Sequence, residues 1–402
     1  STTVSITNVT SFVPGDWVQI REGTNAAWKI DNGSDVCGLG QIVQVTSVAV
    51  TGAPAGTVTL ATPLTLQYQA GLPLTPGVLI SPQICRLNQV ITNAGVENLR
   101  IARVTTTGAA NTRDQVPSVG FRYAVNCWVR GCDMTNVFGS GVFGYYAGNI
   151  EITGNYIHHA YEFDGGGSGY GINLFYRTSQ CLTENNIFKT LRHSMVVQYG
   201  ASDNVFGYNY SEDSAGYLSD MTAHGNYCHA NLFEGNCGVF MSLDNSHGAN
   251  GPGNCYFRNR ARGVLTQAIT IPDTLGTNQA FVGNEGVGSY SISSSPGIFE
   301  YGNNDDGTIK PTGTTNLPDY SYYLGTSVTN LPPKPSWWNI PNFLPVYGPS
   351  NALPVPAIGT ERDIPARVRF NLGGIRTYGP PSLYCQPSNQ VVGWGDTAVF
   401  SV

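Results

Sequence analysis

Short stretches in which apolar and polar residues alternate recur through the middle of the chain, and each of them ends in Asn. Alternation with a period of two residues is typical of β-strands that bury one face. The closing Asn residues are separated by 31, 23, 27, 23 and 25 positions. The clearest copies are NIEITGN (149–155), QCLTENN (180–186), DNVFGYN (203–209), ANLFEGN (230–236), GNCYFRN (253–259) and NQAFVGN (278–284).

A second apolar strand is predicted between successive copies of this unit. Two or three short strands per repeat of ~20–30 residues are the signature of a parallel β-solenoid, whose coils bury their apolar faces by stacking. The sequence therefore predicts an all-β chain with a parallel β-helix over residues 93–310 and one column of Asn side chains at its turns. The second strands are SGVFGYY (140–146), GINLFY (171–176), SMVVQY (194–199), VFMSLD (239–244) and VLTQAI (264–269).

The stretches that precede the repeats carry a family resemblance. Together with the Asn-ended coils, they resemble secreted right-handed parallel β-helix proteins of the pectate-lyase-like superfamily, over about residues 1–310. The resemblance implies a right-handed solenoid, an extracellular or cell-surface location and a polysaccharide partner. It selects no reaction, because this fold hosts lyases, hydrolases, epimerases and adhesins. The stretches are FVPGDWVQI (12–20), GQIVQVTSVAV (40–50), GTVTLATPL (56–64) and AGVENLRI (94–101).

The rest of the chain divides around this solenoid. Residues 1–92 are expected to form a β-rich cap over the first coil, because an open solenoid end exposes strand edges. Residues 311–379 are rich in Pro and Tyr and are expected to lie extended along the solenoid. Residues 380–402 resemble the first strands of a bacterial immunoglobulin-like domain, which needs about 100 residues. We expect that domain to continue beyond residue 402, or these strands to mediate self-association by strand addition.

Charge and cysteine content narrow the classes of partner. The chain has 11% charged residues, a net charge of −6 and a pI of about 5.5, which argues against a nucleic-acid partner. It contains no run of 18 apolar residues, so no membrane span is expected. Its nine Cys residues suit either extracellular disulfides or buried thiols stacked in a core, and both interpretations remain open.

The histidines gather in one part of the repeat. All six lie between 158 and 247. His193 precedes one second strand, His224 lies one coil later, and Asp244 with His247 lies one coil further on. Stacked coils are about 4.8 Å apart. These four residues, with Arg192, are therefore predicted to line one solvent-open groove a few sugars long, although a single β-helix His is more often a structural turn residue.

Three functions fit these residues. A lyase acting on an acidic glycan needs a cation for the uronate carboxylate, a base for the C5 proton and an acid for the leaving oxygen. Arg192 or Arg177 would be the cation, His193 or His224 the base, and a Tyr the acid. Residues expected to contact the glycan are Tyr176, Arg177, Gln198, Asp220 and Arg260.

The alternatives use different chemistry or none. A glycoside hydrolase needs two carboxylates across the scissile bond, for which Asp220 and Asp244 are the candidates. A non-catalytic adhesin, sheath or filament subunit would fit the low charge and the many Gly residues. No cofactor is required by these schemes and no zinc motif is present, while Ca²⁺ among turn Asp and Asn side chains remains open.

Overall fold

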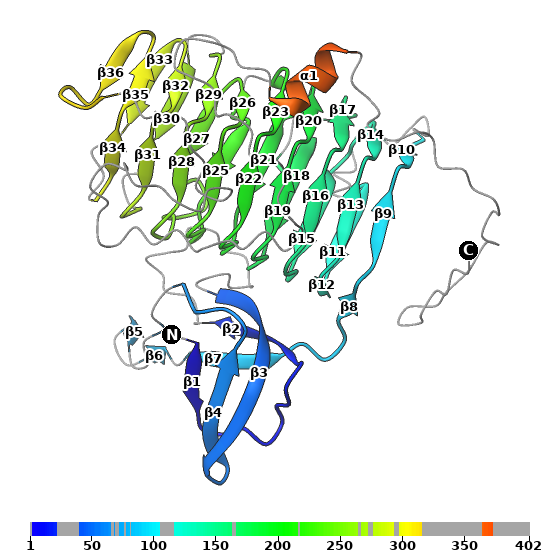
Figure 1. The fold of residues 1–402 in the computed structure, drawn as a ribbon, viewed down its shortest axis with the longest axis vertical. Coiled ribbons are helices and arrows are strands. Elements are labelled where there is room, and N and C mark those ends of the chain that lie inside the picture. The colour runs from blue at the N-terminus through cyan, green and yellow to red at the C-terminus, as the bar shows by residue number, and fades with distance from the viewer. Residues whose placement is uncertain are drawn as a thin grey trace.

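The computed structural model describes residues 2–21, 40–65, 68, 72–75, 78–80, 82–104, 116–162, 166–215, 218–263, 267–271, 276–292, 297–315 and 364–372. In these residues, successive coils stack into a β-helix whose sides are three parallel sheets, and a small antiparallel domain lies beside it (Figure 1). Each coil contributes one short strand to each sheet. The predicted all-β parallel solenoid is therefore confirmed.

The first sheet holds the Asn-ended repeat units. Its strands are β9 (Gly95–Glu97), β13 (Trp128–Arg130), β16 (Glu151–Thr153), β19 (Leu182–Glu184), β22 (Val205–Gly207), β25 (Leu232–Glu234), β28 (Cys255–Phe257), β31 (Ala280–Val282) and β34 (Phe299–Tyr301).

The second sheet follows it in every coil. Its strands are β10 (Arg100–Ala102), β14 (Asp133–Thr135), β17 (Tyr156–His158), β20 (Ile187–Lys189), β23 (Tyr210–Ser211), β26 (Cys237–Gly238), β29 (Arg260–Ala261), β32 (Glu285–Gly286) and β35 (Asn303–Asp305), with β36 (Thr308–Lys310) antiparallel at the end.

The third sheet contains the second strands predicted from the sequence. Its strands are β11 (Val119–Arg122), β15 (Ser140–Tyr145), β18 (Tyr170–Phe175), β21 (His193–Val197), β24 (Met221–Ala223), β27 (Met241–Leu243), β30 (Gln267–Ile271) and β33 (Ser289–Ile292). A short pair, β8 (Ile91–Thr92) and β12 (Ala124–Val125), lies where the chain enters the solenoid.

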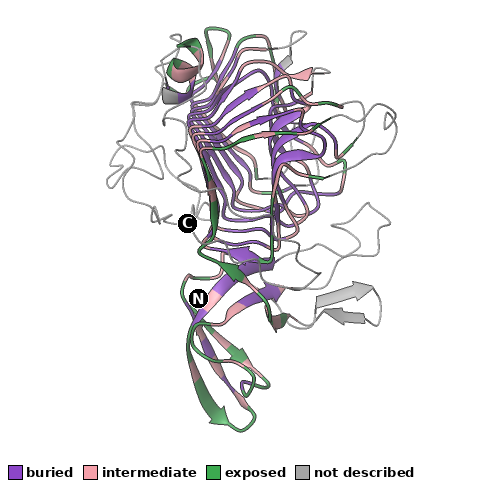
Figure 2. Ribbon diagram, turned by 90° about the vertical axis from the view of Figure 1, so that its right-hand side faces the viewer, coloured by how far each residue is buried: buried purple, intermediate pink, exposed green. Residues whose placement is uncertain are grey.

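The solenoid core consists of stacked layers of like side chains, and most of the coil residues around it are buried (Figure 2). One such stack runs through Phe206, Phe233, Tyr256 and Phe281, whose neighbouring ring centroids lie 4.8, 4.7 and 5.1 Å apart. All four rings are buried. The alternation of apolar residues in the repeat units therefore places an aromatic ring at the same depth in successive coils.

The predicted Asn column is confirmed. Nδ2 of Asn186 donates to Oδ1 of Asn209 at 3.0 Å and to the Ile152 carbonyl at 2.9 Å. Its own Oδ1 accepts from the backbone N–H and Nδ2 of Asn155. The column continues one coil beyond the prediction, so that it runs through Asn155, Asn186, Asn209, Asn236, Asn259, Asn284 and Asn303.

A second amide column, which the sequence analysis did not predict, lies on the other side of the first sheet. Nδ2 of Asn204 donates to Oδ1 of Asn231 at 2.9 Å, and the pattern continues through Asn254 to Gln279. The backbone N–H of Cys181 donates to Oδ1 of Asn204 at 3.0 Å. Each strand of the first sheet in these coils is therefore held at both ends by buried amides.

The N-terminal domain is an antiparallel sheet in the order β1, β4, β3, β2, β7. Its strands are β1 (Thr3–Ile6), β2 (Trp17–Arg21), β3 (Gly40–Gly52), β4 (Ala55–Leu60) and β7 (Gln83–Arg86), and β5 (Leu72–Thr75) pairs with β6 (Val78–Ile80) beside it. The small core of the domain is aliphatic and consists of Val9, Val18, Ile20, Val43, Val45, Val58 and Leu60.

This domain contacts the side of the solenoid, whereas a cap over the first coil was expected. The backbone N–H of Ile42 donates to Oγ of Ser179 at 2.9 Å, and Oγ of Ser202 donates to the Gly40 carbonyl at 3.3 Å. Ser179 and Ser202 belong to a line of single β-bridges that joins successive coils. The first part of β3 therefore lies across several coils. Gly40 and Ile42 form hydrogen bonds there with side chains at the turns.

The segment 311–379 departs from the expected extended form where it is described. Residues Pro365–Asn371 form the helix α1. Pro suits the first turn of a helix, because its missing N–H would be unpaired there in any case. Arg369 donates to the carbonyls of Gly154 and Asn185 at 3.1 and 2.6 Å, which anchors α1 on the solenoid. The expected strands at 380–402, and self-association through them, lie outside the described residues.

The described cysteines form no disulfide bonds. Cys127, Cys132, Cys181, Cys228, Cys237 and Cys255 are buried, and Cys85 is half-buried. Burial raises the pKa of Cys181 to about 12. Of the two interpretations, extracellular disulfides or buried thiols, the described residues fit buried thiols. No helix among the described residues is long and apolar enough to cross a membrane.

Candidate active site

The register of the third sheet aligns the candidate residues on its outer face. Val197 pairs with Ala223, and Ala223 with Leu243, and all three side chains are fully buried in the core. Because successive strand residues point to opposite faces, the next residue along each strand faces outward. These next residues are Gln198, His224 and Asp244.

Four of the outward side chains form a chain of contacts. Nδ1 of His224 lies 2.6 Å from Oδ2 of Asp244. Nε2 of His224 lies 3.2 Å from Nε2 of His247, and Nδ1 of His247 lies 3.5 Å from the Tyr199 hydroxyl. We call Tyr199, His224, Asp244 and His247 the histidine cluster. It spans three coils and lies at the surface, with the His224 and Asp244 side chains 15% and 17% exposed.

The loop after β27 fixes the carboxylate of the cluster. The backbone N–H of Ser246 donates to Oδ1 of Asp244 at 2.9 Å, and Nδ2 of Asn250 donates to the Asp244 carbonyl at 2.7 Å. Burial acts to raise the pKa of Asp244, but the hydrogen bonds and positive charge from His224, with the Ser246 N–H, lower it below its usual value. Asp244 is therefore ionised at neutral pH, and it requires a proton on Nδ1 of His224.

His193 lies behind the cluster. Its ring centroid is 5.8 Å from that of His224, and only 5% of the residue is exposed. Nδ1 of His193 contacts the Ser219 carbonyl at 2.7 Å, so this nitrogen carries the proton. Burial, and then the charges of His224 and Arg192, lower the pKa of His193 to about 3. A histidine that stays neutral in this way can position its neighbours, but it does not take up a proton near pH 7.

Tyr256 supports the cluster from inside the solenoid, and the sequence analysis did not identify it. Its hydroxyl donates to the Ser242 carbonyl at 2.8 Å and accepts from the backbone N–H of Ala223 at 3.0 Å. These two atoms belong to the strands that carry Asp244 and His224. The sequence could have indicated this role, because Tyr256 occupies a repeat position that is Phe in neighbouring coils. A buried Tyr hydroxyl requires a polar partner.

Aromatic rings lead along the solenoid to the cluster. Tyr146, Tyr176 and Tyr199 lie on consecutive coils, with centroid distances of 5.6 and 5.4 Å, and Tyr199 lies 5.4 Å from His247. All of these rings are half-buried. Tyr176, expected to contact glycan, is therefore one coil away from Tyr199.

Gln198 lies beside the cluster, and Arg192 lies near His193. Gln198 occupies the coil before His224 in the same outward row, and its Nε2 donates to Oδ1 of Asn173 at 2.9 Å. Gln198 is buried. Arg192 is half-buried, and its charge lies near enough to lower the pKa of His193.

Two other candidates, Arg177 and Arg260, lie elsewhere. Arg177 is buried beneath the N-terminal domain, where a Cβ atom on Gly40 would come within 2.1 Å of its Cδ. Arg260 forms an ion pair with Glu285 at 2.9 Å on the second sheet. Neither joins the histidine cluster. Arg177 packs against Gly40, and Arg260 lies on a different sheet from the cluster.

Asp220 is fully buried and acts within the fold. Its Oδ1 accepts from the hydroxyls of Ser194 and Ser211 at 3.2 and 3.0 Å, and its Oδ2 accepts from the backbone N–H groups of Val239 and Phe240 at 2.5 and 3.2 Å. Burial raises its pKa to about 6. With no exposed surface, this carboxylate is not placed to face a sugar, so the arrangement does not favour Asp220 and Asp244 as a hydrolase pair.

A second His–carboxylate pair provides a comparison. Nε2 of His158 lies 2.8 Å from Oδ1 of Asp133, with 12% and 17% of the side chains exposed. Nδ1 of His158 lies 2.5 Å from Nδ1 of His159. This pair lies on the second sheet, away from the histidine cluster. It thus combines the same residue types at another face of the solenoid.

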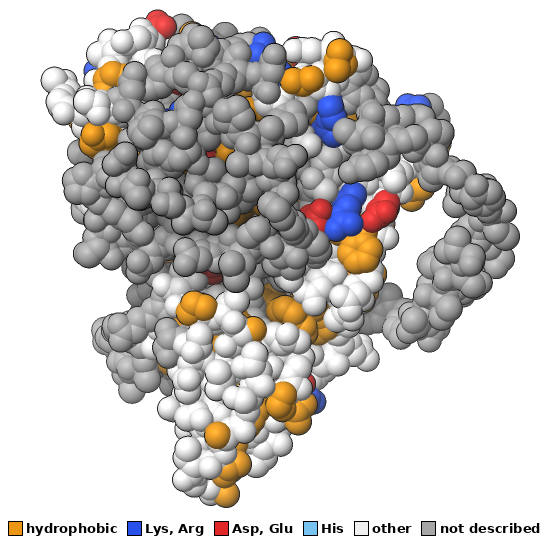
Figure 3. Space-filling model, viewed as in Figure 1, with side chains coloured by type: hydrophobic (Ala, Val, Ile, Leu, Met, Phe, Trp, Pro, Cys, Tyr) orange, Lys and Arg blue, Asp and Glu red, His pale blue; other side chains and the backbone are white. Residues whose placement is uncertain are grey.

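Charged side chains elsewhere occur in small groups of opposite sign. Arg130 contacts Glu151 at 2.6 Å and Glu97 at 3.5 Å on the first sheet. On the face drawn in Figure 3, blue and red side chains likewise lie next to one another. Such pairs are individually satisfied, as surface ion pairs of a scaffold are, and they differ from the linked contacts of the histidine cluster.

The described part of the chain lacks a cluster of metal ligands. No group of three or more His, Cys, Asp and Glu side chains there is arranged to hold a metal ion. The turn amides proposed for Ca²⁺ accept hydrogen bonds from the preceding coil along both columns. Their oxygens are therefore already engaged in holding coils together.

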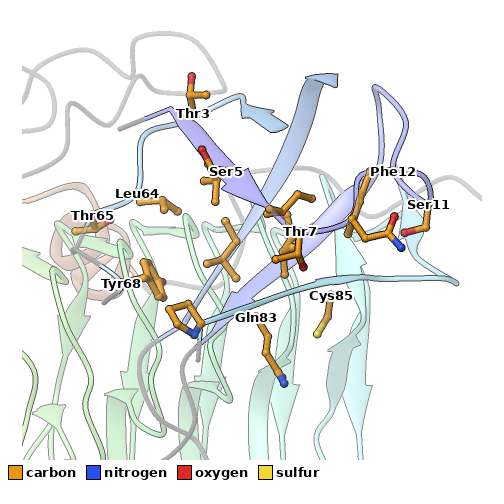
Figure 4. Close-up of a pocket in the computed structure, with 16 residues that line it drawn as sticks. Thr3, Ser5, Thr7, Ser11, Phe12, Leu64, Thr65, Tyr68, Gln83 and Cys85 are labelled. Carbon is orange, nitrogen blue, oxygen red and sulfur yellow. The ribbon is translucent and has the colours of Figure 1, made fainter. Parts of the chain in front are cut away.

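A cavity of about 1120 Å³ lies in the N-terminal domain (Figure 4). Thr3, Ser5 and Thr7 line one side of it, and Phe12 and Tyr68 contribute aromatic rings. Its lining residues all come from 3–85, whereas the histidine cluster comes from 199–247. The histidine cluster thus contributes no residue to the lining of the cavity.

Comparison with known proteins identifies the type of solenoid. The family described as "Right handed beta helix region" matches residues 90–261. No curated protein matches the chain. One similar solved structure is the tailspike protein gp49 from Pseudomonas phage LKA1, at 15% identity and a TM-score of 0.42, covering 71% of this chain and 44% of that chain. Another is the tailspike gp61 of Pseudomonas phage phi297, at 11% identity and a TM-score of 0.42, covering 75% and 53%.

The chain thus spans about half the length of these two tailspikes. The segment that the right-handed β-helix family matches, residues 90–261, covers the coils from β8 to β29, including the strands that carry His193, His224 and Asp244. Together with the three stacked parallel sheets, it identifies the fold of this chain as a right-handed parallel β-helix.

Proposed function

We propose that the chain is an extracellular protein of the pectate-lyase-like superfamily that binds an acidic polysaccharide and cleaves it by β-elimination at the histidine cluster. The observation that carries this proposal is the continuous set of contacts from Asp244 through His224 and His247 to Tyr199. It links a carboxylate, two imidazoles and a phenol on the outer face of neighbouring coils. These are the groups that proton transfer to and from a sugar requires.

Each group has a role in the elimination. Asp244 keeps the proton of His224 on Nδ1, which leaves Nε2 as the proton acceptor. The His224–His247 pair removes the C5 proton of a uronate, the C4–O bond breaks, and a C4–C5 double bond forms. The Tyr199 hydroxyl, next to His247, returns a proton to the leaving oxygen. Arg192 meets the uronate carboxylate, whose charge must be neutralised for the C5 proton to become acidic.

The aromatic rows support a polysaccharide partner. Tyr145 and Phe175 occupy the outward row that leads through Gln198 to His224, one residue per coil of about 4.8 Å. Arg122 lies over the Tyr145 ring at 4.4 Å and continues this row. Both rings offer an apolar surface to a sugar chain lying along the solenoid axis, and the Tyr145 ring adds a polar hydroxyl.

Incubation with a panel of uronate-containing and neutral polysaccharides tests the proposal. Absorbance near 235 nm reports the unsaturated product, and we expect it with at least one uronate polymer. New reducing ends without that absorbance would replace elimination by hydrolysis. Binding without cleavage, or neither, would favour the non-catalytic adhesin, sheath or filament subunit.

A further inference from the structure

The two imidazoles of the histidine cluster face one another through their Nε2 atoms. These atoms are 3.2 Å apart, the ring centroids are 4.6 Å apart, and the ring planes meet at 81°. Two facing nitrogens at this distance must share something that both lone pairs attract, which is a proton or a metal cation. The surroundings of the two rings favour binding of a metal cation between these nitrogens.

The opposite nitrogens are already engaged. Nδ1 of His224 donates to the carboxylate of Asp244 at 2.6 Å, so its Nε2 carries the lone pair. Nδ1 of His247 faces the Tyr199 hydroxyl at 3.5 Å. A histidine whose second ring nitrogen is held by a carboxylate or another oxygen is the usual arrangement of a metal-binding histidine, because the bond fixes the tautomer and the ring orientation.

The spacing also fits one ion. Zn²⁺–N bonds are about 2.0–2.1 Å long, and two such bonds at a tetrahedral angle place their nitrogens roughly 3.3 Å apart. His158 and His159, whose Nδ1 atoms are 2.5 Å apart, are too close for that angle. The pair of His158 and His159 therefore serves as a control for metal binding by His224 and His247, because it has the same residue types but a different spacing.

We propose that His224 and His247 together bind one divalent transition-metal ion through their Nε2 atoms, with water or a ligand oxygen completing the coordination. Since the described residues offer no third His, Cys, Asp or Glu ligand, the site relies on two imidazoles. Affinity then follows the order for nitrogen ligands, with Cu²⁺ above Zn²⁺ and Ni²⁺, and Mn²⁺ weakest. Ca²⁺ and Mg²⁺, which prefer oxygen ligands, do not compete.

Such an ion would occupy the lone pair that accepts a proton in the proposed elimination. Metal binding and glycan cleavage would then exclude each other at His224. The metal site depends on the geometry of the two rings and not on the proposed function. Measuring metal binding in the absence of glycan keeps the two conclusions separate.

The test is a titration of the full chain, prepared without a His tag, with Zn²⁺ and Cu²⁺ against a chromophoric chelator. We expect one ion per chain, at least tenfold weaker binding in His224→Ala and in His247→Ala, and a 10–100-fold loss in Asp244→Asn. His158→Ala should bind as the wild type does. A loss confined to His158→Ala, or equal binding by all variants, would overturn the proposal.

Electron paramagnetic resonance of the Cu²⁺ form provides a second readout, whose wild-type spectrum requires no variant. The wild-type spectrum should show hyperfine coupling to two imidazole nitrogens, and His247→Ala should show one. A wild-type spectrum without imidazole coupling would contradict the two-histidine site. A circular dichroism melt of each variant identifies those whose fold is intact.

Discussion

Nδ1 of His224 lies 2.6 Å from Oδ2 of Asp244, although 20 residues separate the two along the chain. The parallel register places them on consecutive coils at the same outward position. The contact therefore depends on the solenoid being assembled, and it fixes which nitrogen of His224 carries the proton.

Replacing Asp244 by Asn should lower turnover on an active uronate polymer by roughly two to four orders of magnitude, the range typical of acid–base groups. The amide is nearly the same size but removes the charge that holds the tautomer of His224. Initial rates of absorbance increase near 235 nm measure the effect. Asp133→Asn is the matched control, since Asp133 contacts His158 on another face. Equal rates in the two variants would contradict a role for Asp244.

Replacing Tyr256 by Phe should destabilise the fold by about 1–2 kcal/mol, because the Ala223 N–H and the Ser242 carbonyl lose a buried partner. Turnover should fall as well, since these atoms hold the strands that carry His224 and Asp244. Urea unfolding and steady-state kinetics give the two values. Tyr123→Phe, at a ring that is 39% exposed, should change neither, and a similar loss there would remove the argument for Tyr256.

Replacing Asn236 by Ala should lower the free energy of unfolding by about 3 kcal/mol. Its side chain donates to Oδ1 of Asn259 and to the Phe206 carbonyl, and it accepts from Asn209. Each buried group left without a partner costs roughly 1–3 kcal/mol. Chemical denaturation measures the loss. Asn88→Ala, at an exposed Asn, should stay within about 0.5 kcal/mol of wild type, and an equally small effect at Asn236 would speak against the column as a stabilising element.

Stability should fall as pH rises from 4 to 7 because of Asp203. Burial raises the pKa of this carboxyl to about 7, whereas Asp titrates near 4 in unfolded chains. Between these values the folded chain holds a proton that the unfolded chain has released, so raising the pH favours unfolding. Asp203 accepts from the Thr65 hydroxyl at 2.5 Å, which joins the N-terminal domain to the solenoid.

The variant Asp203→Asn isolates this contribution. The free energy of unfolding of wild type minus that of the variant should decrease between pH 4.5 and pH 7.5. Subtracting the two urea series cancels the other titrating groups. A difference that stays constant with pH would show that Asp203 titrates normally.

The sequence predicted the first Asn column because every copy of the repeat ends in Asn at a fixed place. It did not predict the second column, although Asn204, Asn231 and Asn254 occupy the second position of their copies. Earlier copies have Ile150 and Cys181 there, and the last has Gln279. The position therefore looks variable in sequence, whereas the backbone N–H of Cys181 and the Gln279 amide continue the same hydrogen bonds in space.

For the candidate site, coil spacing predicted His224, Asp244 and His247 on neighbouring coils; in the structure their side chains contact one another, and their role as a site stays a proposal. The burial of Asp220 and Arg177 could not be predicted, because it depends on which side of the coil each turn faces. Tyr199 and Ser219 contact the histidines through turns of unequal length. Such turns break the repeat, so a period in the sequence gives no position for them.

The docking of the N-terminal domain shows the same limit. An exposed first coil predicted a cap at the end of the solenoid, since strand edges need cover. The contacts of Ile42 with Ser179 and of Gly40 with Ser202 instead run along its side. They depend on small residues in the turns, Gly148 among them, which leave room for β3.

The most direct test of the proposed function is the rate of absorbance increase near 235 nm on a uronate polysaccharide, compared between wild type, His224→Ala and His158→Ala. We predict that His224→Ala loses roughly two to four orders of magnitude in turnover. His158→Ala, which removes a histidine of similar exposure from the other carboxylate pair, should retain wild-type turnover. Wild-type turnover in a folded His224→Ala protein would contradict the assignment of this cluster as the site of cleavage.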